Sequence, residues 1–347
     1  MIPVNVLYRH TRQRHSDSKK ITQSGNKGDT TMKTAPFTAL TAVLALSIGG
    51  ASAQTLSIGS NPQGSLAYST AAGIAKVSTE ATDLKVRVIP QGGPVVTLPQ
   101  VNSGELDFSI SLSIPAAFSA LGRGMFAKSG KQPNVRTVAA LFPLHLGFFV
   151  RKESKITRIA DLRGKRLGSK YPKQRVIQLT GAAKLATAGL TYKDVIGVPV
   201  PNGVRQVDDF MAGKIDAVTF SLTSGKTAQA HAKVGGIRVL SLPKSPAAEK
   251  AMQKIAPGSH IATIGPGPAY PGVTGPTNVF AAPFLLMAAA KTPDEAVYKI
   301  AKAIYENKAK LVTTHKAFNG MQPGEMHTDI GVPYHPGALK FYKEKGM

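Results

Sequence analysis

Short β-branched runs alternate with longer stretches of helical spacing along most of the chain. This change of hydrophobic period, from two to about 3.6 residues, predicts an α/β protein with largely parallel sheets. The predicted helices end at glycine, or begin with proline and acidic residues in their first turn. The predicted strands are 56–59, 84–89, 106–110, 135–140, 147–151 and 215–220, and the predicted helices are 68–79, 95–102, 176–188, 206–212 and 292–313.

Two segments 109 residues apart repeat one local pattern. Ser103-Gly-Glu-Leu-Asp107 and Ala212-Gly-Lys-Ile-Asp216 each follow a predicted helix and precede a predicted strand. The repeat predicts two similar lobes. Because Asp107 and Asp216 share this context, we expect both carboxylates to fix turns and not to form a catalytic acid pair.

The first 53 residues do not follow the α/β pattern. Residues 1–31 are polar, basic and aperiodic, and we interpret them as a non-native or disordered extension before a true start at Met32. Residues 32–53 combine Lys33, an apolar run of about ten residues and Ala51-Ser-Ala53, which predicts a signal peptide cleaved near Ala53. That run is shorter than the roughly 20 residues of a membrane-spanning helix. The mature protein is therefore predicted to be periplasmic.

The chain is strongly basic and has no cysteine. Its 43 Lys and Arg against 19 Asp and Glu give a net charge of +24, and +19 remains after residues 1–53. The basic residues are spread out and lack an RNA-binding aromatic signature, so we predict no nucleic-acid partner and favour an anionic ligand or a solvated cationic surface. The absence of Cys excludes disulfides, thiolate nucleophiles and sulfur-ligated zinc.

No catalytic or metal-binding motif is present. There is no Gly-x-Ser-x-Gly elbow and no pair of histidines four residues apart after residue 53. Gly225-Lys-Thr227 resembles the end of a phosphate-binding loop, but Phe220 stands where that motif needs glycine. The sequence predicts no catalytic residue, no metal and no cofactor.

Polar loops after predicted strands are the candidate binding residues. The first loop lies before a predicted helix, whose free backbone N–H groups can hold a carboxylate or phosphate; a plain helix-capping loop is the alternative. The other loops follow predicted strands of the two lobes, where ligands bind in open parallel sheets. For Lys173 and Arg175, an anion clamp and a solvated basic turn remain equal alternatives. The candidates are Ser60, Gln63, Gly64, Ser65, Tyr68, Ser113, Lys173, Arg175, Ser221 and Thr223.

The Pro/Gly-rich stretch 264–276 is predicted to be neither helix nor central strand. It is either a surface loop or a rigid segment where the chain returns between the lobes.

The sequence resembles the TAXI family of solute receptors, the extracytoplasmic binding subunits of TRAP transporters, over essentially all of 56–346. The resemblance rests on Ile58-Gly-Ser60, Gly64 and Tyr68, the two Asp-containing repeats, Ile159-Ala-Asp-Leu-Arg-Gly-Lys-Arg166, Ala262-Thr-Ile264, Tyr270-Pro-Gly272 and Val332-Pro-Tyr-His-Pro-Gly-Ala338. It implies a two-lobed periplasmic-binding-protein type II fold with a ligand cleft between lobes. The expected divisions are 54–147 for lobe 1, 148–264 for lobe 2, and 265–347 for the return crossing and the rest of lobe 1.

The resemblance further implies a small anionic solute, of the carboxylate class, delivered to TRAP membrane subunits that include a fused permease. Ser60, Gln63, Gly64, Ser65, Tyr68 and Ser113 are carried over from the family. The chain departs from the family at Asn61-Pro62, at Ala67 and at Gln174-Arg-Val-Ile177. The alternatives are the binding protein of an ABC importer for a sulfonate, nitrate or thiamine precursor, and an exported hydrolase.

Overall fold

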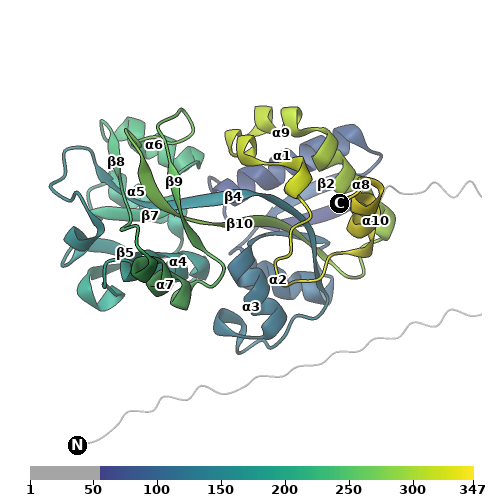
Figure 1. Cartoon of the computed structure of the whole chain (residues 1–347), viewed down its shortest axis with the longest axis horizontal. Coiled ribbons are helices and arrows are strands. Elements are labelled where there is room, and N and C mark those ends of the chain that lie inside the picture. Colours follow the sequence, from purple (N-terminus) through teal and green to yellow (C-terminus); the bar gives the residue numbers. More distant parts are fainter. Residues whose placement is uncertain (1–54) are drawn as a thin grey trace, which may run out of the picture. The chain divides into compact units, whose positions relative to one another are not determined.

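The computed structural model describes residues 55–347 (Figure 1). The predicted extension over 1–31, signal peptide over 32–53 and cleavage near Ala53 lie outside these residues. Residues 55–347 fall within one compact unit, in which ten strands form one connected sheet. The strand order is β2-β1-β3-β10-β4-β7-β5-β6, with β8 beside β4 and β9 beside β10. No helix among residues 55–347 is long and apolar enough to cross a membrane.

The first lobe begins with three parallel strands, in which β1 lies between β2 and β3. Helices connect these strands, as parallel pairing requires. Gly104 and Gly122 end α2 and α3 in the left-handed conformation that glycine adopts without strain. The elements are β1 (Thr55–Ser60), α1 (Leu66–Ala81), β2 (Lys85–Pro90), α2 (Pro94–Ser103), β3 (Phe108–Leu112), α3 (Ser113–Leu121) and η1 (Gly124–Phe126).

Two long antiparallel strands, β4 (Val135–Arg151) and β10 (Thr277–Ala289), run through both lobes (Figure 1). The sequence predicts two extended runs separated at Pro143, and this prediction is wrong, because β4 continues through the proline. Pro143 lies opposite Pro283, so the proline of each strand faces a residue that also lacks an N–H group. The crossing is therefore poor in backbone hydrogen bonds at this pair.

The second lobe repeats the parallel arrangement with β5 between β6 and β7. The antiparallel neighbours β7 and β8 attach it to β4, so the sheets are parallel within each lobe but antiparallel where the lobes are connected. The elements are η2 (Ile159–Leu162), β5 (Arg166–Lys170), α4 (Arg175–Ala186), η3 (Tyr192–Asp194), β6 (Ile196–Val200), α5 (Gly203–Met211), β7 (Ala217–Ser221), α6 (Gly225–Lys233), β8 (Ile237–Leu240), α7 (Pro246–Ile255) and β9 (His260–Ile264).

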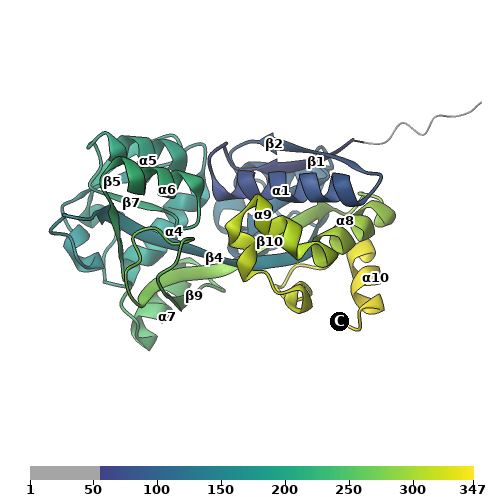
Figure 2. The same ribbon diagram turned by 90° about the horizontal axis from the view of Figure 1, so that it is seen from above.

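The C-terminal helices pack on the first lobe, where α1 contacts both α8 and α9 and α8 contacts α10 (Figure 2). The single helix predicted over 292–313 is in fact two helices. Asn307 separates them with φ −115° and ψ 32°, and its side-chain amide donates to the carbonyl of Ala303 at 2.9 Å, a local bond that competes with helix continuation. The elements are α8 (Asp294–Glu306), α9 (Lys308–Thr314), η4 (Lys316–Gly320), η5 (Pro323–Glu325) and α10 (Pro336–Glu344).

The two predicted repeats occupy the same position in each lobe. Asp107 accepts hydrogen bonds from the backbone N–H and the hydroxyl of Ser57, both at 2.8 Å. Asp216 accepts from the backbone N–H of Arg166 at 2.8 Å and pairs with its guanidinium. Each carboxylate thus ties the third strand of its lobe to the first.

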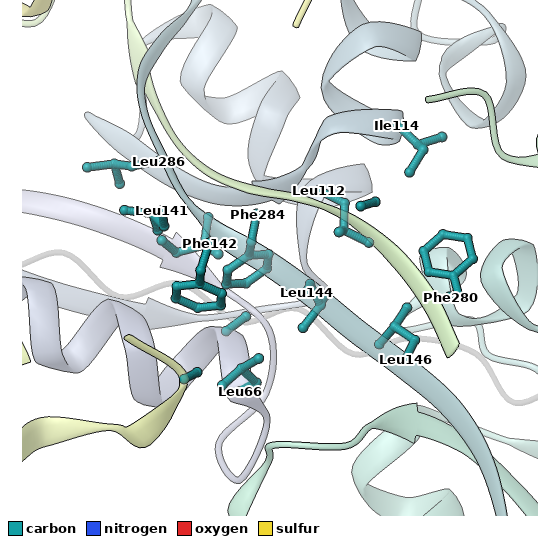
Figure 3. Packing of buried hydrophobic residues seen from close by; sticks show 14 of the residues in the cluster. Leu66, Leu112, Ile114, Leu141, Phe142, Leu144, Leu146, Phe280, Phe284 and Leu286 are labelled. Carbon is teal, nitrogen blue, oxygen red and sulfur yellow. The ribbon is translucent and has the colours of Figure 1, made fainter. Parts of the chain in front are cut away.

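The apolar core is continuous along the crossing strands. Figure 3 shows Leu144 and Leu146 of β4 beside Phe284 and Phe280 of β10, with Leu66 of α1 facing the same region. All five side chains are less than 9% exposed. Leu144, Leu146 and Phe284 of this row also line a cavity between the lobes.

Candidate functional site

A cavity lies where the two lobes and the crossing strands meet. Its first-lobe wall comes from the β1–α1 loop, the start of α1 and the end of β3, and its second-lobe wall comes from the start of α4 and the end of β7. Leu144, Leu146 and Phe284 form its floor. The space open to the centre of a water-sized sphere is about 60 Å³. One water needs roughly 10–15 Å³ on this measure, so the cavity suits a compact molecule of a few heavy atoms.

The lining is mostly apolar and contains no charged side chain among the residues described. Its polar members are hydroxyl and amide side chains: Asn61, Ser65, Gln174, Thr180, Thr219 and Ser221. Such groups orient a ligand by hydrogen bonds while the apolar surface supplies burial.

Two helices begin at this cavity. Ser65, the residue before α1, accepts a hydrogen bond from the backbone N–H of Tyr68 at 3.2 Å and donates to the carbonyl of Pro62 at 2.6 Å. Gln174 holds the equivalent place before α4, but its side chain makes no capping bond to that helix. Its side-chain amide oxygen instead accepts from the backbone N–H of Gly203 at 2.9 Å. The first N–H groups of a helix have no acceptor within it, so both starts offer donors on the positive end of a helix dipole.

Asn61 brings an unusual polar atom to the cavity. Its side-chain oxygen is buried and has no hydrogen-bond partner among the described residues. A side chain on Gly93 would approach that oxygen to 1.8 Å, so this close packing requires glycine. An unpaired buried amide group is costly unless a ligand or water completes it.

Buried residues of the second lobe hold its wall of the cavity in place. Lys170 and Tyr171 both have positive φ, 67° and 39°, a strained conformation for residues other than glycine. The strain turns Tyr171 into the core, where its hydroxyl donates to Gln206 at 2.6 Å and burial raises its pKa. Gln206 in turn donates to the carbonyl of Thr219 at 3.0 Å, which holds a residue of the cavity wall.

The structure brings two of the predicted residues, Ser65 and Ser221, into the cavity lining. Ser60 is fully buried behind it and donates to the carbonyl of Asn61 at 3.0 Å. Gln63 and Tyr68 bond to each other at 3.3 Å on the outer side of the loop. Gly64, with φ +83°, lies near Val204 of the other lobe.

The remaining predicted residues lie outside the lining. Lys173 and Arg175 are exposed, since the β5–α4 loop turns their side chains away from the cavity. Ser113 is buried at the start of α3, where its hydroxyl has no hydrogen-bond partner within residues 55–347, and Thr223 lies near the 265–276 loop. These positions leave the binding roles of all ten candidates as predictions.

Sequence reasoning missed four polar lining residues: Asn61, Gln174, Thr180 and Thr219. The signal for Gln174 was present, because it follows the helix-capping Ser65 by 109 residues, the spacing of the repeat. Thr180 and Thr219 carry no such signal, since they stand within regular elements among apolar neighbours.

The lobes are in close contact beside the cavity. A side chain on Gly92 of the first lobe would approach the backbone carbonyl oxygen of Lys173 in the second lobe to 2.9 Å. Of the 264–276 stretch, Ile264 ends β9 and residues 265–276 form a loop between the antiparallel strands β9 and β10. The hydroxyl of Tyr270 in this loop lies 2.8 Å from Nδ1 of His145 on β4. The loop is therefore attached to a crossing strand.

Several solved structures are similar to this chain. BugD, a periplasmic binding protein, is 12% identical, with 84% of this chain and 93% of BugD covered and a TM-score of 0.54. A periplasmic transporter is 16% identical, with 84% and 92% covered and a TM-score of 0.52. The alkanesulfonate-binding protein SsuA from Xanthomonas axonopodis pv. citri, bound to MOPS, is 16% identical with 83% of each chain covered, at a TM-score of 0.48.

The first two likenesses show the fold, and the predicted two-lobed periplasmic-binding-protein type II class is confirmed. Residues 58–346 match the NMT1-like family over most of the chain. The chain belongs to the NMT1-like family.

Proposed function

We propose that this chain is an extracytoplasmic solute-binding protein that encloses one small solute between its lobes and delivers it to a membrane importer. The observation that carries the proposal is the cavity whose walls come from both lobes and whose floor comes from the crossing strands. A solute there contacts every part that must move for the lobes to separate. Hydroxyl and amide groups line the cavity, so we propose binding and no catalysis.

The solute that we propose is a compact anion with an apolar body. The starts of α1 and α4 supply backbone N–H donors suited to a carboxylate or sulfonate oxygen. The leucine and phenylalanine floor suits a short hydrocarbon portion. Residues 148–264 carry 20 Lys and Arg against seven Asp and Glu, a charge that attracts anions toward this lobe from a distance.

The membrane partner is proposed to be an importer of the ABC or the TRAP type. The TAXI motifs support a TRAP complex, whereas the family match is to the NMT1-like family and does not specify TRAP. We therefore place the ABC alternative at least level with TRAP. Solute uptake by vesicles that carry the co-purified membrane partner distinguishes them, because ABC transport stops without ATP and TRAP transport stops without an ion gradient.

The proposed function is tested by thermal unfolding of residues 54–347 with pivalate, methanesulfonate, inorganic phosphate, glutamate and neutral pivalamide. A solute at about 100 times its Kd stabilises the folded protein by roughly 2.7 kcal/mol, or several degrees in Tm. We expect one chemical class to raise Tm. No increase with any of these solutes, on protein refolded to remove bound molecules, would contradict the proposal.

The variant Gly92→Val tests whether solute binding requires the two lobes to approach each other. Its side chain would meet the Lys173 carbonyl only when the lobes approach, and Gly92 does not line the cavity. Its Cβ would also come within 2.9 Å of Cγ2 of Val96 in the same lobe, an exposed side chain that must turn aside in either state. We expect it to keep the fold but to lose at least about 1.4 kcal/mol of solute binding, a tenfold loss. Unchanged affinity would show that binding does not depend on this approach of the lobes.

A further inference from the structure

Lys184 is a fully buried lysine in the middle of α4. It is 0% exposed, and its Nζ has no hydrogen-bond partner among the described residues. The Nζ atom lies 5.6 Å from the ring centre of Phe148 and 5.3 Å from that of Phe280. Aromatic faces attract a cation but do not replace the hydrogen bonds that an ammonium group makes in water. An apolar residue would fill this site at lower cost, so the lysine calls for a functional explanation.

Lys184 does not line the cavity, but it follows the lining residues of α4 along the same helix. It stands one helical turn after Thr180, which lines the cavity, and residues four apart share one helix face. Long side chains on a helix lean toward its N-terminus, which for Lys184 is the direction of the cavity. Phe280 pairs with Leu146 of the cavity floor, and Figure 3 shows Leu144, Leu146 and Phe280 in succession.

We propose that Lys184 is the counter-charge of the solute: its ammonium group selects an anion in the cavity and takes up a proton when that anion binds. This inference rests on the proposed function and adds a specificity residue to it. Lys184 acts on the solute through the apolar wall and does not touch it. Its role is therefore to favour and position the negative charge of the solute. An apolar wall transmits the electrostatic attraction better than water does.

The electrostatic surroundings allow this behaviour. Burial lowers the pKa of Lys184 to about 7, and no neighbouring charge contributes to the shift. A nearby anion favours the charged amine and so raises this pKa. The elements around Lys184 carry the following titratable groups: Glu249, Lys250 and Lys254 of α7, Arg166 and Lys170 of β5, Tyr192 of η3, Arg136, His145 and Arg151 of β4, and, on β9 beside β10, His260.

The proposal predicts the sign of a pH dependence. Above pH 7 the free protein holds a neutral amine, and an anion must bring a proton with it. Its affinity therefore falls as pH rises above 7, by up to about tenfold per pH unit for one linked proton. A neutral solute of the same shape shows no such dependence. His145 has a pKa lowered to about 4, mainly by burial, and stays neutral throughout this range.

The experiment measures the Kd of pivalate, methanesulfonate and the neutral isostere pivalamide by calorimetry at about pH 6 and about pH 8.5. For the unaltered chain we expect at least one anion to bind roughly ten times more weakly at the higher pH. In Lys184→Met we expect weaker anion binding with the pH dependence lost. The matched controls are Lys254→Met, which removes an exposed lysine of α7, and His260→Gln. Both variants should keep the pH dependence of anion binding.

A titration of the Lys184 amine by ¹⁵N NMR adds a readout that needs no solute. A midpoint near the ordinary value of about 10.5 would overturn the inference, as would a pH dependence that persists in Lys184→Met. Binding of pivalamide but of neither anion would overturn it together with the proposed anionic solute, while the proposed solute-binding role would stand. Binding of none of the three, together with no hit in the thermal screen, would overturn both.

Discussion

The two lobes repeat one strand–helix plan 109 residues apart, yet equivalent residues do different work. In both lobes an Asp ties the third strand to the first, through Ser57 in one and Arg166 in the other. The first tie is made by a serine backbone and hydroxyl. The second adds a guanidinium, whose hydrogen bonds lower the pKa of Asp216. The backbone plan is thus preserved while the side-chain chemistry changes.

The same contrast appears at the cavity. Ser65 caps its own helix, whereas Gln174 leaves α4 uncapped and bonds to the start of α5. About three turns further along each helix, the buried Ala75 of α1 corresponds to the buried Lys184 of α4. The first lobe therefore offers a conventional apolar helix, and the second offers an open helix start with a buried amine behind it. The comparison teaches that the polar asymmetry of the cavity comes from the second lobe.

The variant with the largest expected effect is Lys184→Met. It gives α4 an apolar buried position like that of Ala75 in α1. The pKa of Lys184 is lowered by burial, so folding opposes the charged form that the unfolded chain holds below about pH 10. The native lysine thus costs stability at pH 7 and progressively less as pH rises toward 10. We expect a gain of about 4 kcal/mol in the free energy of unfolding at pH 7, measured by denaturant titration.

The control is the same titration at about pH 10, where the gain should shrink to the packing difference alone. Lys254→Met should show little change at either pH, because that lysine is exposed. A destabilised Lys184→Met variant at pH 7 would mean that the amine is satisfied in solution, and the contrast between the helices would lose its energetic basis.

Much of the fold could be predicted because local signals agreed with the tertiary structure. Apolar period, glycine stops and the repeated Asp motif indicated the three parallel strands of the first lobe and, in the second, α4, α5 and β7; β5 and β6 were not predicted. Prediction failed where a single contact that the apolar pattern does not register decided the outcome, across strands in one case and within one helical turn in the other. Pro143 stays in a strand because Pro283 faces it, and Asn307 breaks a helix by bonding to Ala303.

The site was harder to predict than the fold. Two of the polar loops after strands place a predicted residue in the cavity lining, Ser65 and Ser221, but the sequence did not indicate the other polar lining residues. Lys173 and Arg175 look suited to an anion by residue type, yet the positive φ of Lys170 and Tyr171 redirects the loop and leaves them exposed. Lys184 gave no signal at all, since a lysine within a helix is normally on the surface.

The second prediction concerns acid stability and His145 of β4, one of the two strands that join the lobes. His145 of β4 contacts the hydroxyl of Tyr270, and its pKa is lowered to about 4 by burial and by His260. The stabilisation that its neutral form provides is complete above pH 6.5 and is lost as pH falls through 4, because the unfolded chain binds the proton first. We expect a loss of about 3 kcal/mol in unfolding free energy over that interval.

His145→Gln should remove most of this acid sensitivity, as judged by denaturant titrations at about pH 7 and about pH 4. His260→Gln, which alters the exposed neighbour across Ala281, should remove only a small part. Equal acid sensitivity in His145→Gln would place the labile region in one of the lobes instead of at their connection.

The prediction with the smallest expected effect compares the starts of α1 and α4. Gln174→Ala leaves the buried N–H of Gly203 without its acceptor, at a cost of about 1–3 kcal/mol. Ser65→Ala removes only a cap, at a cost of about 1 kcal/mol. Thermal and denaturant unfolding should therefore rank the Gln174 variant as the less stable. The reverse order would mean that the α1 cap holds the cavity together, and that the second lobe is not the more specialised of the two.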